Sequence, residues 1–222
     1  MDMVLPALTA PLAAPAPWRL CGDGVILFYR FNRHLSGIWQ HHYPVKLDKP
    51  ALTFGAVMLV DYRESPVGPY RELLLIPGIF RFGMGFYPSI THIYVSSEDS
   101  VVNGYRNWGI PKKRCDFERR GDRFILTDGG TTIADLQFKT LGPRFPVTTI
   151  TIPGMWRTLC HMKGGQRLKT TVSGNGSAQL ARMTSAYVDH GGFPDFTRGT
   201  LLTAWKIDNF ELFFPPARMS AP

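Results

Sequence analysis

The stretch Gly104-Tyr-Arg-Asn-Trp-Gly-Ile-Pro-Lys-Lys113 marks the end of a helix and the start of a strand. Residues Asp99 to Asn107 can form a short helix, which the second glycine of the stretch terminates and the proline keeps from resuming. Because proline disfavours the helical conformation of the residue before it, Lys112 and Lys113 are expected to begin an extended segment. Neighbouring side chains on a strand point to opposite faces. One lysine can therefore enter an interior while the other stays nearer the rim.

The two adjacent lysines admit two interpretations. Lysines that follow a proline turn are usually solvated surface residues. An amine that acts as a nucleophile must instead be neutral, and either burial or a nearby cation lowers its pKa. On an extended backbone the two ammonium groups diverge, whereas burial in an apolar cavity can lower a lysine pKa by roughly 3–5 units. Desolvation is therefore expected to be the larger of the two effects.

The motif Trp-Gly-x-Pro-Lys-Lys, with a glycine seven residues before the proline, resembles the active-site motif of the acetoacetate decarboxylase family. A second match, Gly68-Pro-Tyr-Arg-Glu72, is similar to the family's segment ending in Tyr-x-Glu, whose glutamate faces the reactive lysine. The strands and turns after Lys113 follow the family's order nearly to the C-terminus, so the resemblance covers most of the chain. It implies that Lys112 forms an imine, that Lys113 is its neighbouring cation, and that Glu72 shuttles a proton or orients the substrate.

The chain also departs from the family's pattern. Relatives that act on acetoacetate carry an arginine just before the first strand, where this sequence reads Gly22-Asp23-Gly24, and a second glutamate early in the next strand, where Gly55 aligns. Tyr105-Arg106 stands where Arg-Glu is usual. Arg30 or Arg106 could replace the missing cation. The substrate is therefore not expected to be acetoacetate itself, and these two arginines are candidate substrate-binding residues.

Tyr70 and Trp108, within the two motifs, are further candidates for binding the substrate. Three histidines, His34, His41 and His42, invite a metal interpretation, but they lack the usual i,i+4 pair and a nearby acidic ligand. The three cysteines are odd in number and far apart, which argues against a disulfide framework. A nucleophile elbow and a dinucleotide fingerprint are both absent from the sequence. We expect neither a metal nor a cofactor.

The chain has 222 residues, of which 44% are hydrophobic and 19% are charged, and this composition is typical of a globular protein. The net charge of +8 could indicate nucleic acid, an anionic membrane or acidic small molecules as partners. The basic residues are scattered, however, and no RNA-binding aromatic motif, zinc-finger spacing or basic tail accompanies them. A small-molecule substrate, and no nucleic acid, is the expected partner.

Residues 1–18 are rich in Ala, Pro and Leu and are expected to form an extended arm ahead of a single domain over residues 19–222. Prolines break the apolar run, so it is a poor signal peptide, and no later stretch reaches the roughly 18 apolar residues that a membrane helix needs. The arm could wrap a neighbouring subunit or be a loose terminus. We expect a cytoplasmic protein that does not contact a membrane.

The pattern of elements predicts the α+β class with predominantly antiparallel β structure. Nine or ten short strands and at most three helices favour one domain whose curled sheets form a closed barrel or cone around an apolar cavity. A hairpin is predicted at Asp128-Gly-Gly130, between strands within residues 124–138, and a helix from Asn32 to His42. The resemblance implies the same cone-like barrel, a homo-oligomer and no cofactor.

The expected function is that of a carbon–carbon lyase that decarboxylates a small keto acid through a lysine imine. In the same superfamily such an imine can serve aldol condensation, dehydration or cyclisation, including that of polyketide-like substrates. A third hypothesis is a non-catalytic barrel that binds apolar ligands and uses Lys112 to hold an anion.

Overall fold

The protein is described by a computed structural model over residues 12–40 and 47–221. Its α-helices are α1 (Arg33–Gln40) and α2 (Glu98–Trp108). Its strands are β1 (Trp18–Arg30), β2 (Phe54–Glu64), β3 (Tyr70–Ile76), β4 (Ile79–Phe82), β5 (Gly85–Pro88), β6 (His92–Val95), β7 (Lys112–Arg114), β8 (Asp116–Arg120), β9 (Arg123–Asp128), β10 (Thr131–Thr148), β11 (Thr158–Lys163), β12 (Gln166–Thr171), β13 (Ser173–Val188), β14 (Thr200–Phe214) and β15 (Arg218–Ser220). Three short 3₁₀ turns are η1 (Thr149–Thr151), η2 (Gly154–Trp156) and η3 (Phe196–Arg198).

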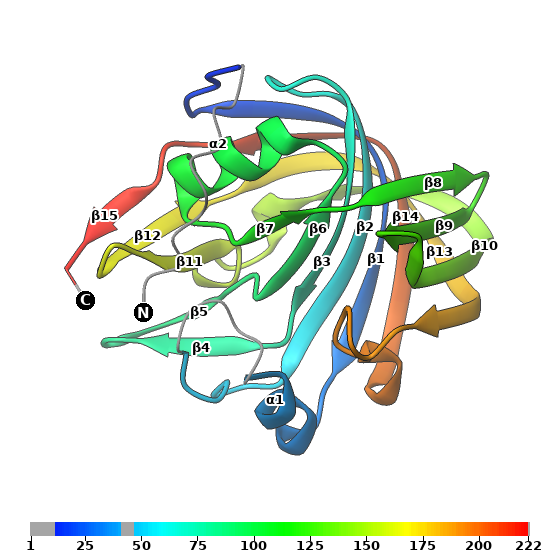
Figure 1. Ribbon diagram of the computed structural model, residues 1–222, viewed down its shortest axis with the longest axis horizontal. Coiled ribbons are helices and arrows are strands. Elements are labelled where there is room, and N and C mark those ends of the chain that lie inside the picture. The colour runs from blue at the N-terminus through cyan, green and yellow to red at the C-terminus, as the bar shows by residue number, and fades with distance from the viewer. Residues whose placement is uncertain (1–11, 41–46, 222) are drawn as a thin grey trace.

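Ten strands form one curled sheet in the order β7-β6-β3-β2-β1-β14-β13-β10-β9-β8. Neighbouring strands in it are antiparallel except β6 and β7, which are parallel. The two edge strands, β7 and β8, are separated in the chain by Cys115 alone. The sheet must therefore curl until its edges approach each other, and it forms the nearly closed barrel of Figure 1. The predicted fold class is confirmed.

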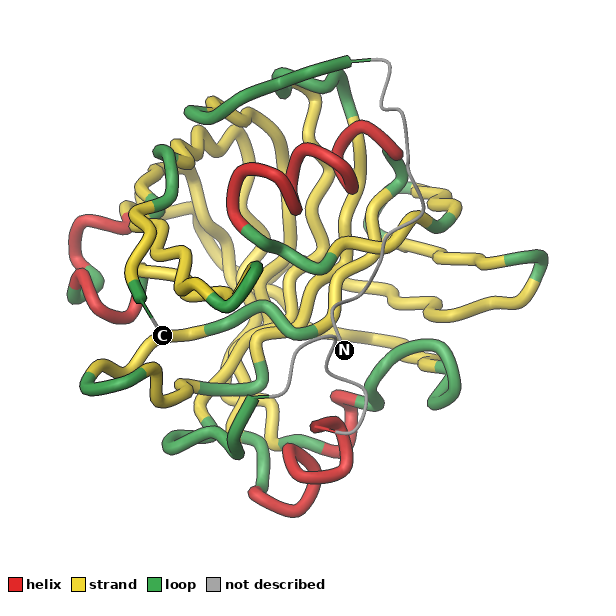
Figure 2. The backbone as a smooth tube through the Cα atoms, turned by 60° about the vertical axis from the view of Figure 1, so that its left-hand side comes forward, coloured by secondary structure: helices red, strands yellow, loops and turns green. Residues whose placement is uncertain are grey.

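The smaller elements lie at one end of this barrel. Strands β11, β12 and β15 form a three-stranded sheet, and β4 pairs with β5. Figure 2 shows α2 lying across the curled strands. The helix packs near β7 and β6, which it joins, and near β12.

The predicted number and length of strands are wrong. The chain has fifteen strands over the described residues, and β10, β13 and β14 contain 18, 16 and 15 residues. Long parts of these strands are exposed and carry polar residues or glycine, so their sequence resembles that of loops. Strands β3 and β4 are separated only by Pro77-Gly78.

Local turn and capping predictions are confirmed. Gly129 and Gly130 have φ values of +55° and +84° and join β9 to β10 in a two-residue hairpin turn. The side chain of Asn32 accepts a hydrogen bond from the Leu35 N–H at 2.7 Å and caps α1. His34 is exposed, whereas His41 and His42 lie outside the described residues.

The described part of the N-terminal arm packs on α2 of its own chain. The Ala14 N–H donates to Asn103 Oδ1 at 2.9 Å, and Asn107 Nδ2 donates to the Ala14 carbonyl oxygen at 2.9 Å. Residues 1–11 of the predicted arm lie outside the described residues. The expected homo-oligomer stays a prediction.

Apolar residues cover both faces of the middle strands. On β3, Leu73 and Leu75 belong to one buried cluster with Leu27 and Leu59, while Leu74 belongs to a second cluster. Alternation along the strand places Glu72 on the same face as Leu74. A carboxylate thus enters a buried, apolar part of the molecule.

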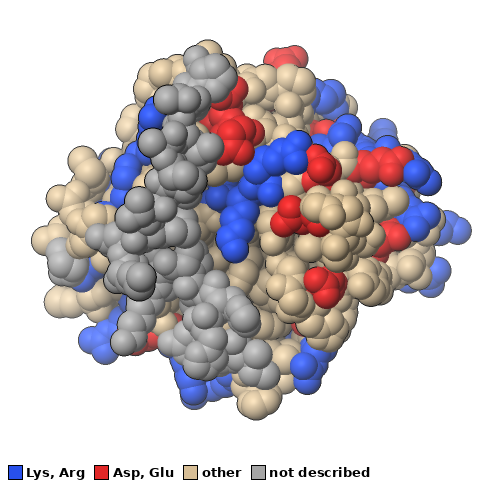
Figure 3. All heavy atoms as spheres, viewed as in Figure 1, with Lys and Arg blue, Asp and Glu red and all other residues tan. Residues whose placement is uncertain are grey.

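Charges of both signs are mixed on the face shown in Figure 3. The three cysteines are free thiols. Within residues 12–40 and 47–221, no helix is long and apolar enough to cross a membrane, and no group of three or more His, Cys, Asp and Glu is arranged to hold a metal ion.

Candidate active site

The end of α2 positions the first lysine of the Pro-Lys-Lys motif. Gly109 adopts φ = +67° and its N–H donates to the Tyr105 carbonyl oxygen at 2.9 Å, so the helix ends there as predicted. After Pro111, β7 pairs in parallel with β6 and places Lys112 opposite Ile93. The segment that carries the lysines is therefore a fixed strand.

The two lysines point to opposite sides of β7. Lys112 is buried, with 7% of its surface exposed, whereas Lys113 is exposed. The prediction that one lysine enters the interior is confirmed. The role of Lys113 as a neighbouring cation has no geometric support, because the alternation of the strand directs its ammonium group away from Lys112.

Three oxygen atoms surround the Lys112 ammonium group. Nζ lies 2.9 Å from Ser100 Oγ, 3.3 Å from Glu72 Oε2 and 3.4 Å from the Tyr70 hydroxyl. The other carboxylate oxygen of Glu72 accepts a hydrogen bond from the Tyr62 hydroxyl at 2.8 Å. The bond to Ser100 has an ordinary length, whereas the contacts with Glu72 and Tyr70 are longer. The three oxygens together define the position of Nζ.

Burial dominates the electrostatics of this cluster. Desolvation lowers the pKa of Lys112, and the negative charge of Glu72 opposes that shift without reversing it. This agrees with the expectation that desolvation is the larger effect. Burial, reinforced by Glu72, raises the pKa values of Tyr62 and Tyr70 well above their usual value, so both phenols are neutral donors.

A glycine on α2 makes room for the lysine. A Cβ at position 104 would lie 2.9 Å from both Cδ and Cε of Lys112, closer than real Cβ contacts come. Gly104 is the glycine seven residues before the proline. Its place in the motif therefore has a steric reason.

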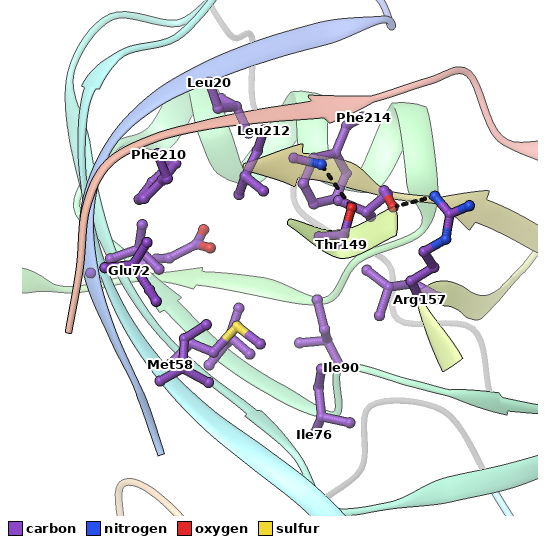
Figure 4. Close-up of a pocket in the computed structure, with 18 of the residues that line it drawn as sticks. Leu20, Met58, Glu72, Ile76, Ile90, Thr149, Arg157, Phe210, Leu212 and Phe214 are labelled. Carbon is purple, nitrogen blue, oxygen red and sulfur yellow. Dashed lines mark hydrogen bonds between the residues drawn. The ribbon is translucent and has the colours of Figure 1, made fainter. Parts of the chain in front are cut away.

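The lysine and glutamate line a large cavity with mostly apolar walls. Its volume is about 740 Å³, within the range of about 300–1,000 Å³ typical of pockets for drug-sized ligands. Among the described residues that line it, three are charged: Glu72, Lys112 and Arg157. Figure 4 shows Met58, Ile76, Ile90, Phe210 and Leu212 around its apolar part.

Solved structures of acetoacetate decarboxylase and related enzymes share this architecture. The acetoacetate decarboxylase of Legionella pneumophila matches at a TM-score of 0.64 and 13% identity, over 96% of this chain and 93% of that chain. The chain has the acetoacetate decarboxylase-like fold. An acetoacetate decarboxylase-like enzyme of Sphingomonas wittichii matches at 0.66 and 13% identity, over 97% and 98%. The enduracididine biosynthesis enzyme MppR complexed with pyruvate matches at 0.65 and 14% identity, over 96% and 93%.

Neither a family model nor a curated protein matches the sequence. The resemblance that the motifs predicted is thus confirmed as a likeness of fold to enzymes of the acetoacetate decarboxylase-like superfamily.

The acetoacetate decarboxylase-like fold brings some of the predicted residues together and leaves others apart. Tyr70 and Trp108 line the cavity with Lys112 and Glu72. Arg30 and Arg106 do not: both are exposed, at the end of β1 and on the outer side of α2. The hypothesis that either arginine replaces the missing cation in the cavity is wrong for this geometry.

Gly55, which aligns with the family's second glutamate, has a steric role in the sheet. A Cβ on Gly55 would collide with the Ile76 carbonyl oxygen, so this glycine allows a close approach of β2 and β3. Gly55 does not line the cavity, whereas Met58, Val60 and Tyr62 of the same strand do. Glu72 is consequently the one carboxylate among the described lining residues.

Three residues of the site were not predicted from the sequence. Ser100 lies one helical turn before Gly104, and this i,i+4 spacing on α2 was the available signal. Tyr62 lies directly opposite Tyr70 in the pairing of β2 with β3. Arg157, at the end of η2, had no local signal.

Proposed function

We propose that this chain is a lyase that decarboxylates a β-keto acid through an imine on Lys112. The supporting observation is the place of Lys112, buried in an apolar cavity with its pKa lowered and Glu72 3.3 Å away. Burial favours the neutral amine, which is the nucleophilic form.

The proposed reaction uses the amine of Lys112, water and one acid–base group. The neutral amine of Lys112 attacks the ketone carbon, and loss of water from the resulting carbinolamine gives an iminium. The bond between the α-carbon and the carboxylate then breaks, carbon dioxide leaves, and the electron pair forms a neutral enamine. A proton returns to the α-carbon, and hydrolysis releases the ketone and the lysine. Glu72, with Tyr62 bonded to its other oxygen, is the acid–base group proposed for the water and proton steps.

The apolar walls of the cavity favour the loss of carbon dioxide from a charged carboxylate. A carboxylate is disfavoured in apolar surroundings, whereas the enamine and carbon dioxide are neutral. The cavity is also far larger than a four-carbon acid requires, so the proposed substrate carries a bulky apolar substituent and is not acetoacetate. This replaces the expectation of a small keto acid.

A second candidate is an aldol condensation or dehydration through the same imine. The observation that favours it is the cluster of Glu72 with two neutral phenols, Tyr62 and Tyr70, which can take and return protons beside the lysine. One solved structure of MppR is complexed with the condensation product of pyruvate and imidazole 4-carboxaldehyde.

Borohydride trapping tests the imine directly. With β-keto acids of increasing apolar bulk, we expect reduction of the iminium to attach the substrate carbon skeleton to the peptide that contains Lys112. Lys113→Ala is the matched control and should keep the label, whereas Lys112→Ala should lose it. Carbon dioxide release then separates the two candidates.

Labelling that persists in Lys112→Ala and vanishes in Lys113→Ala would reverse the assignment of the lysines. Trapping without carbon dioxide release from any β-keto acid would reject decarboxylation in favour of the second candidate. No labelling by any carbonyl compound would reject imine chemistry and favour the non-catalytic binding barrel.

A further inference from the structure

The cavity has polar groups at two ends and apolar walls between them. At the buried end, the side chains of Lys112 and Glu72 are each 5% exposed. Most of the exposed lining residues, among them Thr148, Thr151 and Trp156, lie at the end of β10 or in the segment that contains η1 and η2, so this segment forms the mouth. Figure 4 shows Glu72 and Arg157 at opposite ends of the pocket.

The guanidinium of Arg157 at the mouth is poorly satisfied. Its Nη1 donates to the Val172 carbonyl oxygen at 3.4 Å, which is longer than the usual range of about 2.7–3.2 Å for an N–H···O hydrogen bond. Its Nε is buried and has no hydrogen-bond partner among the described residues. No carboxylate of residues 12–40 and 47–221 forms an ion pair with it.

Such a group is suited to bind an anion from outside the chain. Arginine stays charged in proteins, and its planar fork matches the two oxygens of a carboxylate. A half-buried guanidinium with an orphaned donor is costly unless a ligand supplies the acceptor. The threonine hydroxyls of the mouth give the same end of the cavity further polar character.

We infer that Arg157 binds a carboxylate at the end of the substrate remote from the carbonyl group that Lys112 attacks. Attack by Lys112 is part of the proposed function, whereas the carboxylate site depends on Arg157 alone. The substrate class is then an elongated keto acid with a carbonyl group at the buried end, an apolar middle and an acid at the mouth. A carboxylate that leaves as carbon dioxide lies beside the carbonyl group, so the group bound by Arg157 is a separate one.

The test uses methyl-ketone acids that differ in the number of methylene groups between carbonyl and carboxylate, each paired with its methyl ester. Calorimetry measures their binding to the full chain, and borohydride trapping measures imine formation separately. For the acid whose length reaches Arg157, we expect binding roughly 10–100-fold tighter than that of its ester, as for a hydrogen-bonded charged group. Arg157→Gln should abolish this preference, so that acid and ester bind equally. Arg182→Gln removes the same charge from an exposed position of β13 outside the cavity and should keep the preference.

The two proposals fail in different ways. Equal binding of acid and ester at every chain length, or a preference that persists in Arg157→Gln, overturns the carboxylate site, whatever the trapping result. A preference that depends on Arg157 without any trapping supports the carboxylate site and rejects the imine. An acid preference that is lost in Lys112→Met and kept in Arg157→Gln would assign the carboxylate to the lysine instead.

Discussion

Replacing Gly104 by alanine tests whether the position of the Lys112 amine, and not only its presence, determines reactivity. The added Cβ would lie 2.9 Å from Cδ and Cε of Lys112, roughly half an ångström short of the 3.4 Å at which ordinary contact begins. The helix itself gains, because alanine within a helix is favoured over glycine by roughly 0.5–1 kcal/mol. The clash is with a flexible side chain, so the lysine should move and the backbone should stay.

The expected result is a loss of reactivity without a loss of stability. Moving Nζ away from Ser100, Glu72 and Tyr70 breaks the geometry that fixes the amine. A misplacement of about 1 Å can cost about 10²-fold, so we expect imine trapping in Gly104→Ala to slow by roughly 10–100-fold. The free energy of unfolding, measured by urea denaturation, should change by less than about 1 kcal/mol.

Measuring both reactivity and stability separates a displaced lysine from a disturbed fold. Trapping rate and unfolding free energy are determined on the same preparations of wild type and Gly104→Ala, with Arg182→Gln as an exposed control. A wild-type trapping rate in Gly104→Ala would refute the claim that Gly104 makes room for the lysine. A loss of stability beyond about 3 kcal/mol would show that the backbone yields instead, as in general overpacking.

Four other predictions concern Glu72, His161 and metal dependence. Glu72→Gln should shift the pH dependence of imine trapping to lower pH, because the Glu72 charge raises the Lys112 pKa and its removal makes the neutral amine available earlier; an unchanged profile would contradict this. In the same variant, proton exchange at the α-carbon of a ketone analogue, measured by deuterium uptake, should fall by roughly 10²–10⁴-fold if the aldol reading holds, whereas a decarboxylase should retain measurable carbon dioxide release. Burial lowers the pKa of His161 to about 4, below its value of 6.5 in the unfolded chain. The contribution of the neutral imidazole to stability is therefore full above pH 6.5 and is lost as the pH falls toward 4. The free energy of unfolding should drop by about 3 kcal/mol over that range, and by less in His161→Gln. Activity should survive exhaustive chelation, and restoration of lost activity by zinc or manganese would overturn a metal-free mechanism.

Local rules explain what the sequence could predict. The end of α2 follows from Gly109 and Pro111, and the separation of Lys112 from Lys113 follows from strand alternation, because each depends on neighbouring residues alone. The hairpin at Gly129 and Gly130 is of the same kind. The pairing of Glu72 with Lys112 joins residues 40 apart in sequence, and it was accessible through resemblance to a family.

The rest depends on which strands pair and how the sheet curls. Arg30 and Arg106 were plausible cations by sequence, yet the faces of β1 and α2 turn both outward. Arg157 lines the cavity directly after η2, and no nearby sequence motif predicts that position. The length of β10 and β13 was hidden by their exposed polar residues, which a paired strand tolerates on its solvent face.

The walls around Lys112 come from strands that are far apart in the chain. The oxygen atoms around its amine come from a contiguous part of the chain, residues 62–112, whereas apolar walls such as Ile207, Phe210 and Leu212 come from β14. Because burial is what lowers the pKa of Lys112, we expect that pKa to be nearer its usual value in a chain whose C-terminal strands are not yet in place. We therefore expect the amine to gain its nucleophilic character only when the last strands have joined the sheet.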